Sequence, residues 1–179
     1  MAHQEQFNFL SKIKNQYPDY FKNKKVLEIG SLNINGSVRM LFEYCHYTGI
    51  DVGEGPGVDI VCPGQLYNAP DNTYHVVISA ECFEHNPSWL ETFQNMIRMC
   101  KSSGLVLFTC ATYGRPEHGT TRSTPNCSPL TVDLKWDYYK NLGIIDFMEV
   151  IDFNKHFSIY QFESRNISPQ DLYFAGFKR

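Results

Sequence analysis

Four residues between positions 28 and 51 have the types and spacing of a nucleoside-binding turn. Glu28 lies within an apolar run, and Gly30 and Gly36 follow that run. Asp51 stands about 20 positions after Gly30. A glycine can turn the backbone sharply beside a ligand and lets the next helix start close to it. An acidic residue at the end of the second strand can accept hydrogen bonds from both ribose hydroxyls. Together these residues predict an adenosine-type cofactor at the carboxyl ends of the strands.

The number of glycines in this turn distinguishes between cofactors. A dinucleotide site uses G-x-G-x-x-G because a pyrophosphate must approach the backbone, whereas Leu32 and Asn33 occupy that stretch here. S-adenosylmethionine has no phosphate, and Glu28 and the amides after Gly30 could hold its ammonium and carboxylate groups. The pattern therefore favours S-adenosylmethionine as the cofactor. A nicotinamide oxidoreductase is a poorly supported alternative function.

These residues need a sheet that brings strand ends together, and the chain alternates between strand and helix patterns. Short runs rich in valine and isoleucine, typical of parallel strands covered on both faces, lie at 26–29, 47–52, 58–61, 75–80 and 105–110. Helices are expected at 3–17, 38–44, 89–100 and 132–142, and strands at 157–162 and 173–177. The alternation predicts an α/β fold in one domain over residues 1–179. Its doubly wound, mostly parallel seven-stranded sheet would have helices on both faces and a C-terminal antiparallel hairpin.

Several motifs occur in a specific order along the chain. They are Val26-Leu27-Glu28-Ile29-Gly30, Asn35-Gly36-Ser37-Val38-Arg39, Tyr47-Thr48-Gly49-Ile50-Asp51, Val76-Val77-Ile78-Ser79-Ala80-Glu81-Cys82-Phe83-Glu84-His85 and Lys101-Ser102-Ser103-Gly104-Leu105-Val106-Leu107. In this order they resemble the class I S-adenosylmethionine-dependent methyltransferases, in particular the small, type 11-like members. The resemblance covers residues 24–111 in motif detail and the whole chain in layout, and the ordered set is far more specific than any single motif.

The resemblance implies a Rossmann-like methyltransferase fold with S-adenosylmethionine as the cofactor. The cofactor-binding residues that it implies are Glu28, Gly30, Ser31, Asn35, Gly36, Ser37, Asp51, Val52, Ala80 and Glu81. The chain departs from the family pattern at Cys62, where an acidic residue usually follows the third strand, and at His75, which replaces an aspartate. These departures leave a second function open, that of a catalytically silent cofactor-binding or scaffolding relative.

Two histidines are candidates for the catalytic proton acceptor. Methyl transfer is an in-line displacement at a sulfonium, and an oxygen or nitrogen acceptor must also lose a proton. His85 follows the fourth strand, and His118 lies in an irregular loop past the fifth strand. The structural alternatives are a hydrogen bond that holds a nearby loop for His85 and a solvated surface position for His118.

The irregular loop at 112–130 is expected to lie on the substrate side, because long structureless loops in compact domains usually carry function. Arg115 and Arg122 could hold an anionic or hydroxyl-rich acceptor through forked hydrogen bonds. Tyr113 in the same loop and Tyr139 on the following expected helix are further candidates for acceptor binding, with core packing as the alternative for Tyr139.

Composition narrows the possible partners. A net charge of -3 provides no broad positive field, which disfavours nucleic acid as a partner. No apolar run approaches the roughly 20 residues that span a bilayer, and no signal-peptide pattern opens the chain, so a cytoplasmic protein is expected. Six cysteines without a C-x-x-C pair predict buried, reduced thiols and no metal site. The expected acceptor is a small molecule or saccharide, because little chain lies outside the core to read a polymer.

Overall fold

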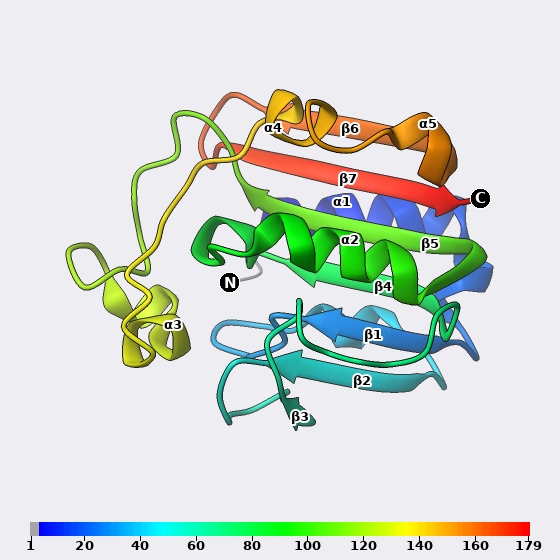
Figure 1. Cartoon of the computed structure of the whole chain (residues 1–179), viewed down its shortest axis with the longest axis horizontal. Coiled ribbons are helices and arrows are strands. Elements are labelled where there is room, and N and C mark those ends of the chain that lie inside the picture. Colours follow the sequence, from blue (N-terminus) through cyan, green and yellow to red (C-terminus); the bar gives the residue numbers. More distant parts are fainter. Residues whose placement is uncertain (1–3) are drawn as a thin grey trace.

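A seven-stranded sheet runs through the computed structural model, which describes residues 4–179, and its strand order is β3-β2-β1-β4-β5-β7-β6 (Figure 1). Five strands are parallel: β1 (Lys25–Ile29), β2 (His46–Asp51), β3 (Ile60–Val61), β4 (Tyr74–Ala80) and β5 (Cys100–Ala111). The hairpin of β6 (Phe157–Arg165) and β7 (Asp171–Lys178) is antiparallel, and β7 also pairs antiparallel with β5. The predicted fold class is confirmed.

Two long helices cover opposite faces of this sheet (Figure 1). They are α1 (Gln4–Gln16) behind the sheet in that view and α2 (Trp89–Met99) in front of it. The shorter helices are α3 (Pro129–Asp133), α4 (Ile144–Met148) and α5 (Phe153–His156), and four 3₁₀ turns are η1 (Pro18–Phe21), η2 (Val38–Leu41), η3 (Phe83–His85) and η4 (Pro125–Cys127). None of the helices described is long and apolar enough to cross a bilayer.

The two faces of the sheet carry separate cores because side chains alternate along each strand. In β4, Val76 and Ile78 pack on the α1 side, whereas Val77 packs on the α2 side. The α2 side is rich in phenylalanine, and the rings of Phe108 and Phe174 stack there with centroids 5.0 Å apart. Burial on both faces holds the parallel strands in position. Their carboxyl ends therefore lie together at one edge of the sheet.

Two expected helices differ from the structure. The helix expected at 38–44 is only the turn η2, and the helix expected at 132–142 is absent because α3 ends at Asp133. Lys135 and Asp137 have φ values of 57° and 44°, which a right-handed helix does not accommodate. Two short helices, α4 and α5, follow instead and were not expected.

Smaller differences concern element ends and cysteines. The third strand is limited to Ile60–Val61, and the fifth begins earlier than expected, at Cys100. The leading helix runs over Gln4–Gln16, and its expected first residue, His3, lies outside the described residues. All six cysteines are free thiols as expected, but only Cys100 and Cys110 are buried.

Candidate functional site

A pocket opens at the carboxyl edge of the sheet, where β1, β2 and β4 end. Its walls come from the segments that directly follow these three strands. Further lining comes from the loop after β5, through residues 127–131 and Trp136. In Figure 1 this loop and α3 project beyond the same edge of the sheet, so the loop is placed to cover the pocket.

The predicted cofactor residues meet in this pocket. Nine of the ten line it: Glu28, Gly30, Ser31, Gly36, Ser37, Asp51, Val52, Ala80 and Glu81. The tenth, Asn35, is next to Gly36 in the chain but is not part of the lining. Residues from four separate segments are thus brought together as the motif order predicts, while their individual contacts with a cofactor stay predictions.

The turn after β1 can only be made by a residue without a side chain. Gly30 has φ at 78°, and a Cβ atom there would lie 2.7 Å from the Cβ of Cys82. The next residue, Ser31, is buried in the pocket wall, and its hydroxyl has no hydrogen-bond partner. Because buried polar groups are normally paired, this hydroxyl is a free partner for a ligand.

Glu28 places a buried carboxyl group in the wall of the pocket. Its Oε2 accepts a hydrogen bond of 2.8 Å from the hydroxyl of Tyr47. Burial raises the pKa of Glu28 to about 7, although the Tyr47 hydrogen bond and the nearby Arg39 act in the opposite direction. A ligand cation next to this carboxyl group would offset the cost of ionising it.

Asp51 stands at the end of β2 and holds the turn that follows β1. Its Oδ2 accepts from the amide of Leu32 at 2.9 Å, and its Oδ1 accepts from the amide of Val52 at 2.7 Å. Burial raises the pKa of Asp51, and the two amides oppose this shift. Each carboxylate oxygen can accept more than one hydrogen bond, so both oxygens can still bind a hydroxyl group.

Both candidate catalytic histidines lie at one side of the pocket. His85 is buried at the end of η3 and lines the pocket, and the ring of His118 packs against it with centroids 5.0 Å apart. Tyr139 completes the cluster, at 5.6 Å from His85 and 5.0 Å from His118. Burial lowers the pKa of His85 to about 3 and also lowers the pKa of His118, so both rings are neutral at physiological pH.

Arg115 points into the protein and joins the loop to the sheet. Its guanidinium forms an ion pair of 3.2 Å with Glu81 and a second with Asp171, and both carboxylates are buried. The hydroxyl of Tyr173 donates to Asp171 at 2.8 Å. The structure therefore uses the guanidinium of Arg115 internally, and a contact with an acceptor stays a prediction.

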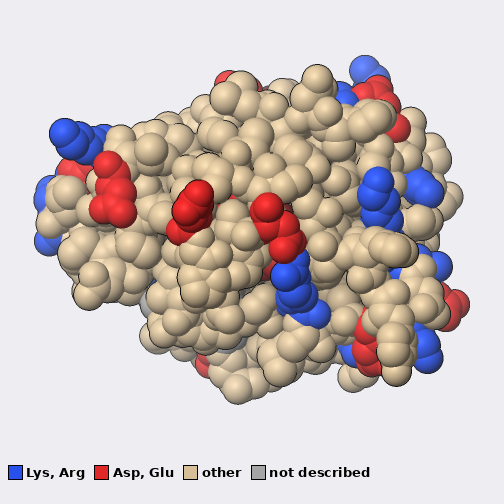
Figure 2. All heavy atoms as spheres, turned by 90° about the horizontal axis from the view of Figure 1, so that it is seen from below, with Lys and Arg blue, Asp and Glu red and all other residues tan. Residues whose placement is uncertain are grey.

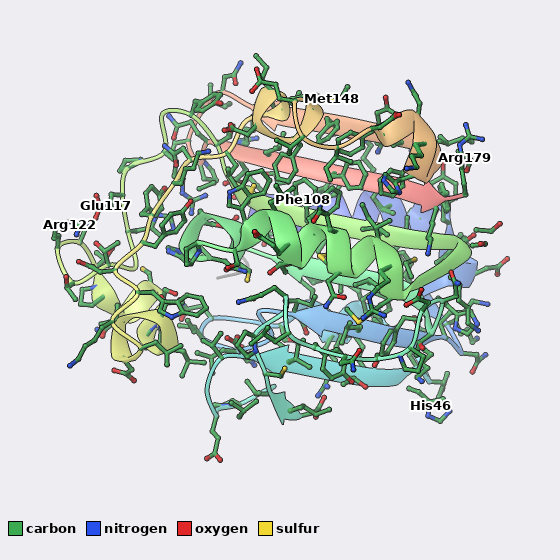
Figure 3. All side chains as sticks on the ribbon, viewed as in Figure 1. His46, Phe108, Glu117, Arg122, Met148 and Arg179 are labelled. Carbon is green, nitrogen blue, oxygen red and sulfur yellow. The ribbon has the colours of Figure 1, made fainter. Side chains whose placement is uncertain are left out.

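Like Arg115 and Tyr139, the other two predicted acceptor residues are not part of the pocket lining. Arg122 is exposed at the tip of the loop, where it pairs with Glu117 and Asp137, and Figure 3 shows Arg122 and Glu117 well beyond the end of the sheet. Tyr113 is largely exposed and donates a hydrogen bond to Asp146. Neither side chain reaches the pocket in this structure, so their role in acceptor binding stays a prediction.

Sequence reasoning did not identify two parts of the site. Asp171, which pairs with Arg115, begins the last strand and is far from the other site residues in the sequence. Trp136 was expected on a helix, whereas it lines the pocket. No local pattern distinguishes either residue, because both reach the site through tertiary contacts alone.

Comparisons with known proteins point to one family. A family model described as a methyltransferase domain matches residues 1–163. Among curated proteins, no sequence matches this chain significantly.

Solved structures share the fold at low sequence identity. One is phosphoethanolamine N-methyltransferase 2 of Haemonchus contortus in complex with S-adenosyl-L-methionine, with a TM-score of 0.65, 15% identity, and coverage of 98% of this chain and 52% of that one. The chain thus spans about half the length of that enzyme. A second is 1,6-didemethyltoxoflavin-N1-methyltransferase of Burkholderia thailandensis, with a TM-score of 0.64, 11% identity and coverage of 96% and 77%. The YcgJ protein of Bacillus subtilis has a TM-score of 0.66, 12% identity and coverage of 99% of both chains.

Proposed function

Because the chain belongs to the class I S-adenosylmethionine-dependent methyltransferases, we propose that it methylates an oxygen or nitrogen atom of a small molecule or saccharide. The observation that carries this proposal is the pocket at the strand ends. There a glycine turn, a buried carboxyl group, an unpaired hydroxyl and a strand-end carboxylate line one wall. S-adenosylmethionine supplies an activated methyl group when it is bound.

The residues of the pocket fit the two polar ends of this cofactor. Glu28 is buried and its environment lacks a direct ion-pair partner among the described residues, which suits the cofactor's ammonium group. Ser31 offers an unpaired hydroxyl to the same end of the molecule. Asp51 can accept from both ribose hydroxyls while it keeps its bonds to the two backbone amides.

The other side of the pocket suits the acceptor. The chain positions the acceptor and excludes water, and the loop at 127–131 with Trp136 forms that part of the lining. His85 and His118 are neutral and lie beside the pocket, so either could take the proton that an oxygen or nitrogen acceptor loses. These roles are part of the proposal.

Two observations support a small-molecule acceptor. On the face shown in Figure 2, basic and acidic side chains are scattered, with no continuous basic stripe for a phosphate backbone. The two enzymes described above are named for small-molecule acceptors. We also propose that the enzyme is cytoplasmic, as expected from the sequence pattern.

Cofactor binding and methyl transfer can be tested separately. S-adenosylmethionine and its demethylated product should each raise the melting temperature, because a ligand of the folded state stabilises it by mass action, and NAD should not. Pools of metabolites and saccharides are then incubated with methyl-labelled cofactor to find the acceptor. Binding of NAD without binding of S-adenosylmethionine would overturn the proposal, and cofactor binding without any transfer would favour the catalytically silent alternative.

A further inference from the structure

Three side chains with metal-binding atoms meet beside the cofactor pocket. Glu84, His85 and His118 each have one ligand atom within 4.8 Å of the others. Glu84 and His85 belong to η3, directly after β4, whereas His118 comes from the loop after β5. The sequence predicted no metal site because the cysteines are scattered. This group contains no cysteine, so that argument does not apply to it.

Two polar atoms of this group are buried and have no hydrogen-bond partner. They are Oε2 of Glu84 and Nδ1 of His85, and the two residues are 0% and 4% exposed. Leaving a buried polar atom unpaired is unfavourable, so such atoms normally have a partner, and a bound ion can be that partner. The other oxygen of Glu84 accepts from the amide of Ala111 at 3.2 Å, which fixes the position of the carboxyl group.

The third side chain is oriented as metal-binding histidines are. Nδ1 of His118 lies 3.1 Å from the backbone oxygen of Pro116, so it carries the proton and donates it. This leaves Nε2 with its lone pair free, which is the arrangement that backbone carbonyls impose on zinc ligands. Close approach of the loop also depends on Gly119, where a Cβ atom would lie 2.7 Å from Cε1 of His85.

The surrounding charges favour a cation at this place. Glu81 is buried next to Glu84, and neither oxygen of Glu81 accepts a hydrogen bond among the described residues. Arg115 faces the same region and forms ion pairs with Glu81 and Asp171. Glu84 forms no ion pair among the described residues, so a divalent ion would supply the counter-charge for its carboxylate.

We propose that Glu84, His85 and His118 bind a divalent transition-metal ion at the edge of the cofactor pocket. Two imidazoles with one carboxylate suit zinc, manganese and iron ions. Ligands at about 2.0–2.2 Å from an ion lie roughly 3 to 4 Å from one another, so small side-chain rotations close the group around it. Three protein ligands leave positions open, as in catalytic rather than structural sites.

The site narrows the acceptor class, and this step rests on the proposed function. His85 lines the cofactor pocket, so an oxygen bound to the ion would stand beside the place proposed for methyl transfer. An ion lowers the pKa of a bound hydroxyl group, whose proton leaves to solvent, so with an ion bound the two imidazoles are metal ligands and do not take the proton. The oxygen lone pair then forms the bond to the methyl carbon, while the carbon–sulfur bond breaks and its electrons stay on sulfur. A hydroxylated acceptor is therefore expected.

The test measures metal binding directly. Protein stripped with a chelator is titrated with Mn²⁺, whose free ion is followed by electron paramagnetic resonance, and with Zn²⁺ by calorimetry. One ion per chain should bind, and His118→Ala and Glu84→Gln should each weaken binding at least about tenfold. The glutamine keeps an oxygen for the Ala111 amide. His46→Ala is the matched control, because His46 is exposed at the start of β2, far from the loop in Figure 3.

Any of three results would overturn the metal site: the absence of saturable binding, binding that persists in both ligand variants, or binding that disappears in His46→Ala. The same samples are melted with and without S-adenosylmethionine, with circular dichroism to confirm folding. Cofactor binding without metal binding overturns this inference alone. Metal binding without cofactor binding leaves the site in place and overturns the proposed function.

Discussion

The buried carboxyl group of Glu28 should make cofactor binding depend on pH. Because its pKa in the free protein is about 7, the group is mostly neutral at pH 6 and ionised at pH 8. An ammonium group binds the ionised form, so affinity should rise with pH, by up to about tenfold per unit below pH 7. Calorimetry between pH 6 and 8 measures this, and a flat profile would show that the ammonium lies elsewhere.

Ionisation of Glu28 with rising pH should destabilise the ligand-free protein, although it favours cofactor binding. This opposite effect provides a control. Its folded pKa is raised, so its contribution is fully present below about pH 4.5 and is lost as pH rises through 7. The loss should be on the order of 3 kcal/mol. Glu28→Gln keeps an acceptor for Tyr47 and should remove this loss, together with the pH dependence of cofactor binding.

Asp51 provides a second test at the scale of one side chain. Asp51→Asn should weaken cofactor binding by about 1.5–3 kcal/mol if a charge-assisted bond to a ribose hydroxyl is lost. The fold should persist, because the asparagine keeps one oxygen for a backbone amide. The control is Asp71→Asn, an exposed carboxylate that pairs with Arg98. Equal affinities in both variants would place the ribose away from Asp51.

The two histidines can be separated by turnover once the acceptor is known. His118→Ala should lower turnover at saturating acceptor while cofactor affinity stays near its original value, because His118 is not part of the pocket lining. His85→Ala is the comparison. If only the His85 variant is inactive and it still binds the metal ion, the proton acceptor is His85. If turnover is lost together with metal binding, the imidazoles act as metal ligands, and if both variants keep full turnover, the acceptor needs neither imidazole.

At the scale of elements, Arg115 should decide whether the loop stays on the sheet. Arg115→Met leaves Glu81 and Asp171 buried without their counter-charge, which should cost about 3–5 kcal/mol of unfolding free energy. Arg122→Met, in the same loop, removes only exposed ion pairs and should cost less than about 1 kcal/mol. Urea unfolding measures both, and equal losses would contradict the anchoring role.

Strands that are buried on both faces could be predicted from the sequence. Segments whose conformation depends on tertiary contacts could not. The Val76-Val77-Ile78 run is continuously apolar, which is typical of a strand covered on both faces, and the structure buries all three side chains. The segment after Asp133 has a helix-like apolar pattern, yet Lys135 and Asp137 adopt positive φ and the chain turns so that Trp136 lines the pocket. Tertiary contacts override local preference there.

At the scale of the molecule, the residues that line the pocket after β1 and β2 could be predicted, whereas the contacts between the loop after β5 and the sheet could not. The glycine turn and Asp51 lie within about 20 residues of each other and have a recognisable spacing. The group of Glu84, His85 and His118 joins an element after β4 to a loop after β5, and the Arg115 ion pairs join that loop to β7. Such contacts depend on how the sheet is assembled, which local patterns do not specify.

The position of β7 has a consequence for how the protein is made. Residues 171–178 form an interior strand between β5 and β6, although they are the last strand along the chain (Figure 1). During synthesis, β5 therefore has one open edge, and the Phe108 ring lacks its partner Phe174, until that strand leaves the ribosome. Nascent chains arrested with residue 165 just outside the tunnel should be cleaved rapidly by protease and held by chaperones, and chains arrested well past residue 178 should be resistant. Equal resistance at both lengths would show that the first five strands fold without β7.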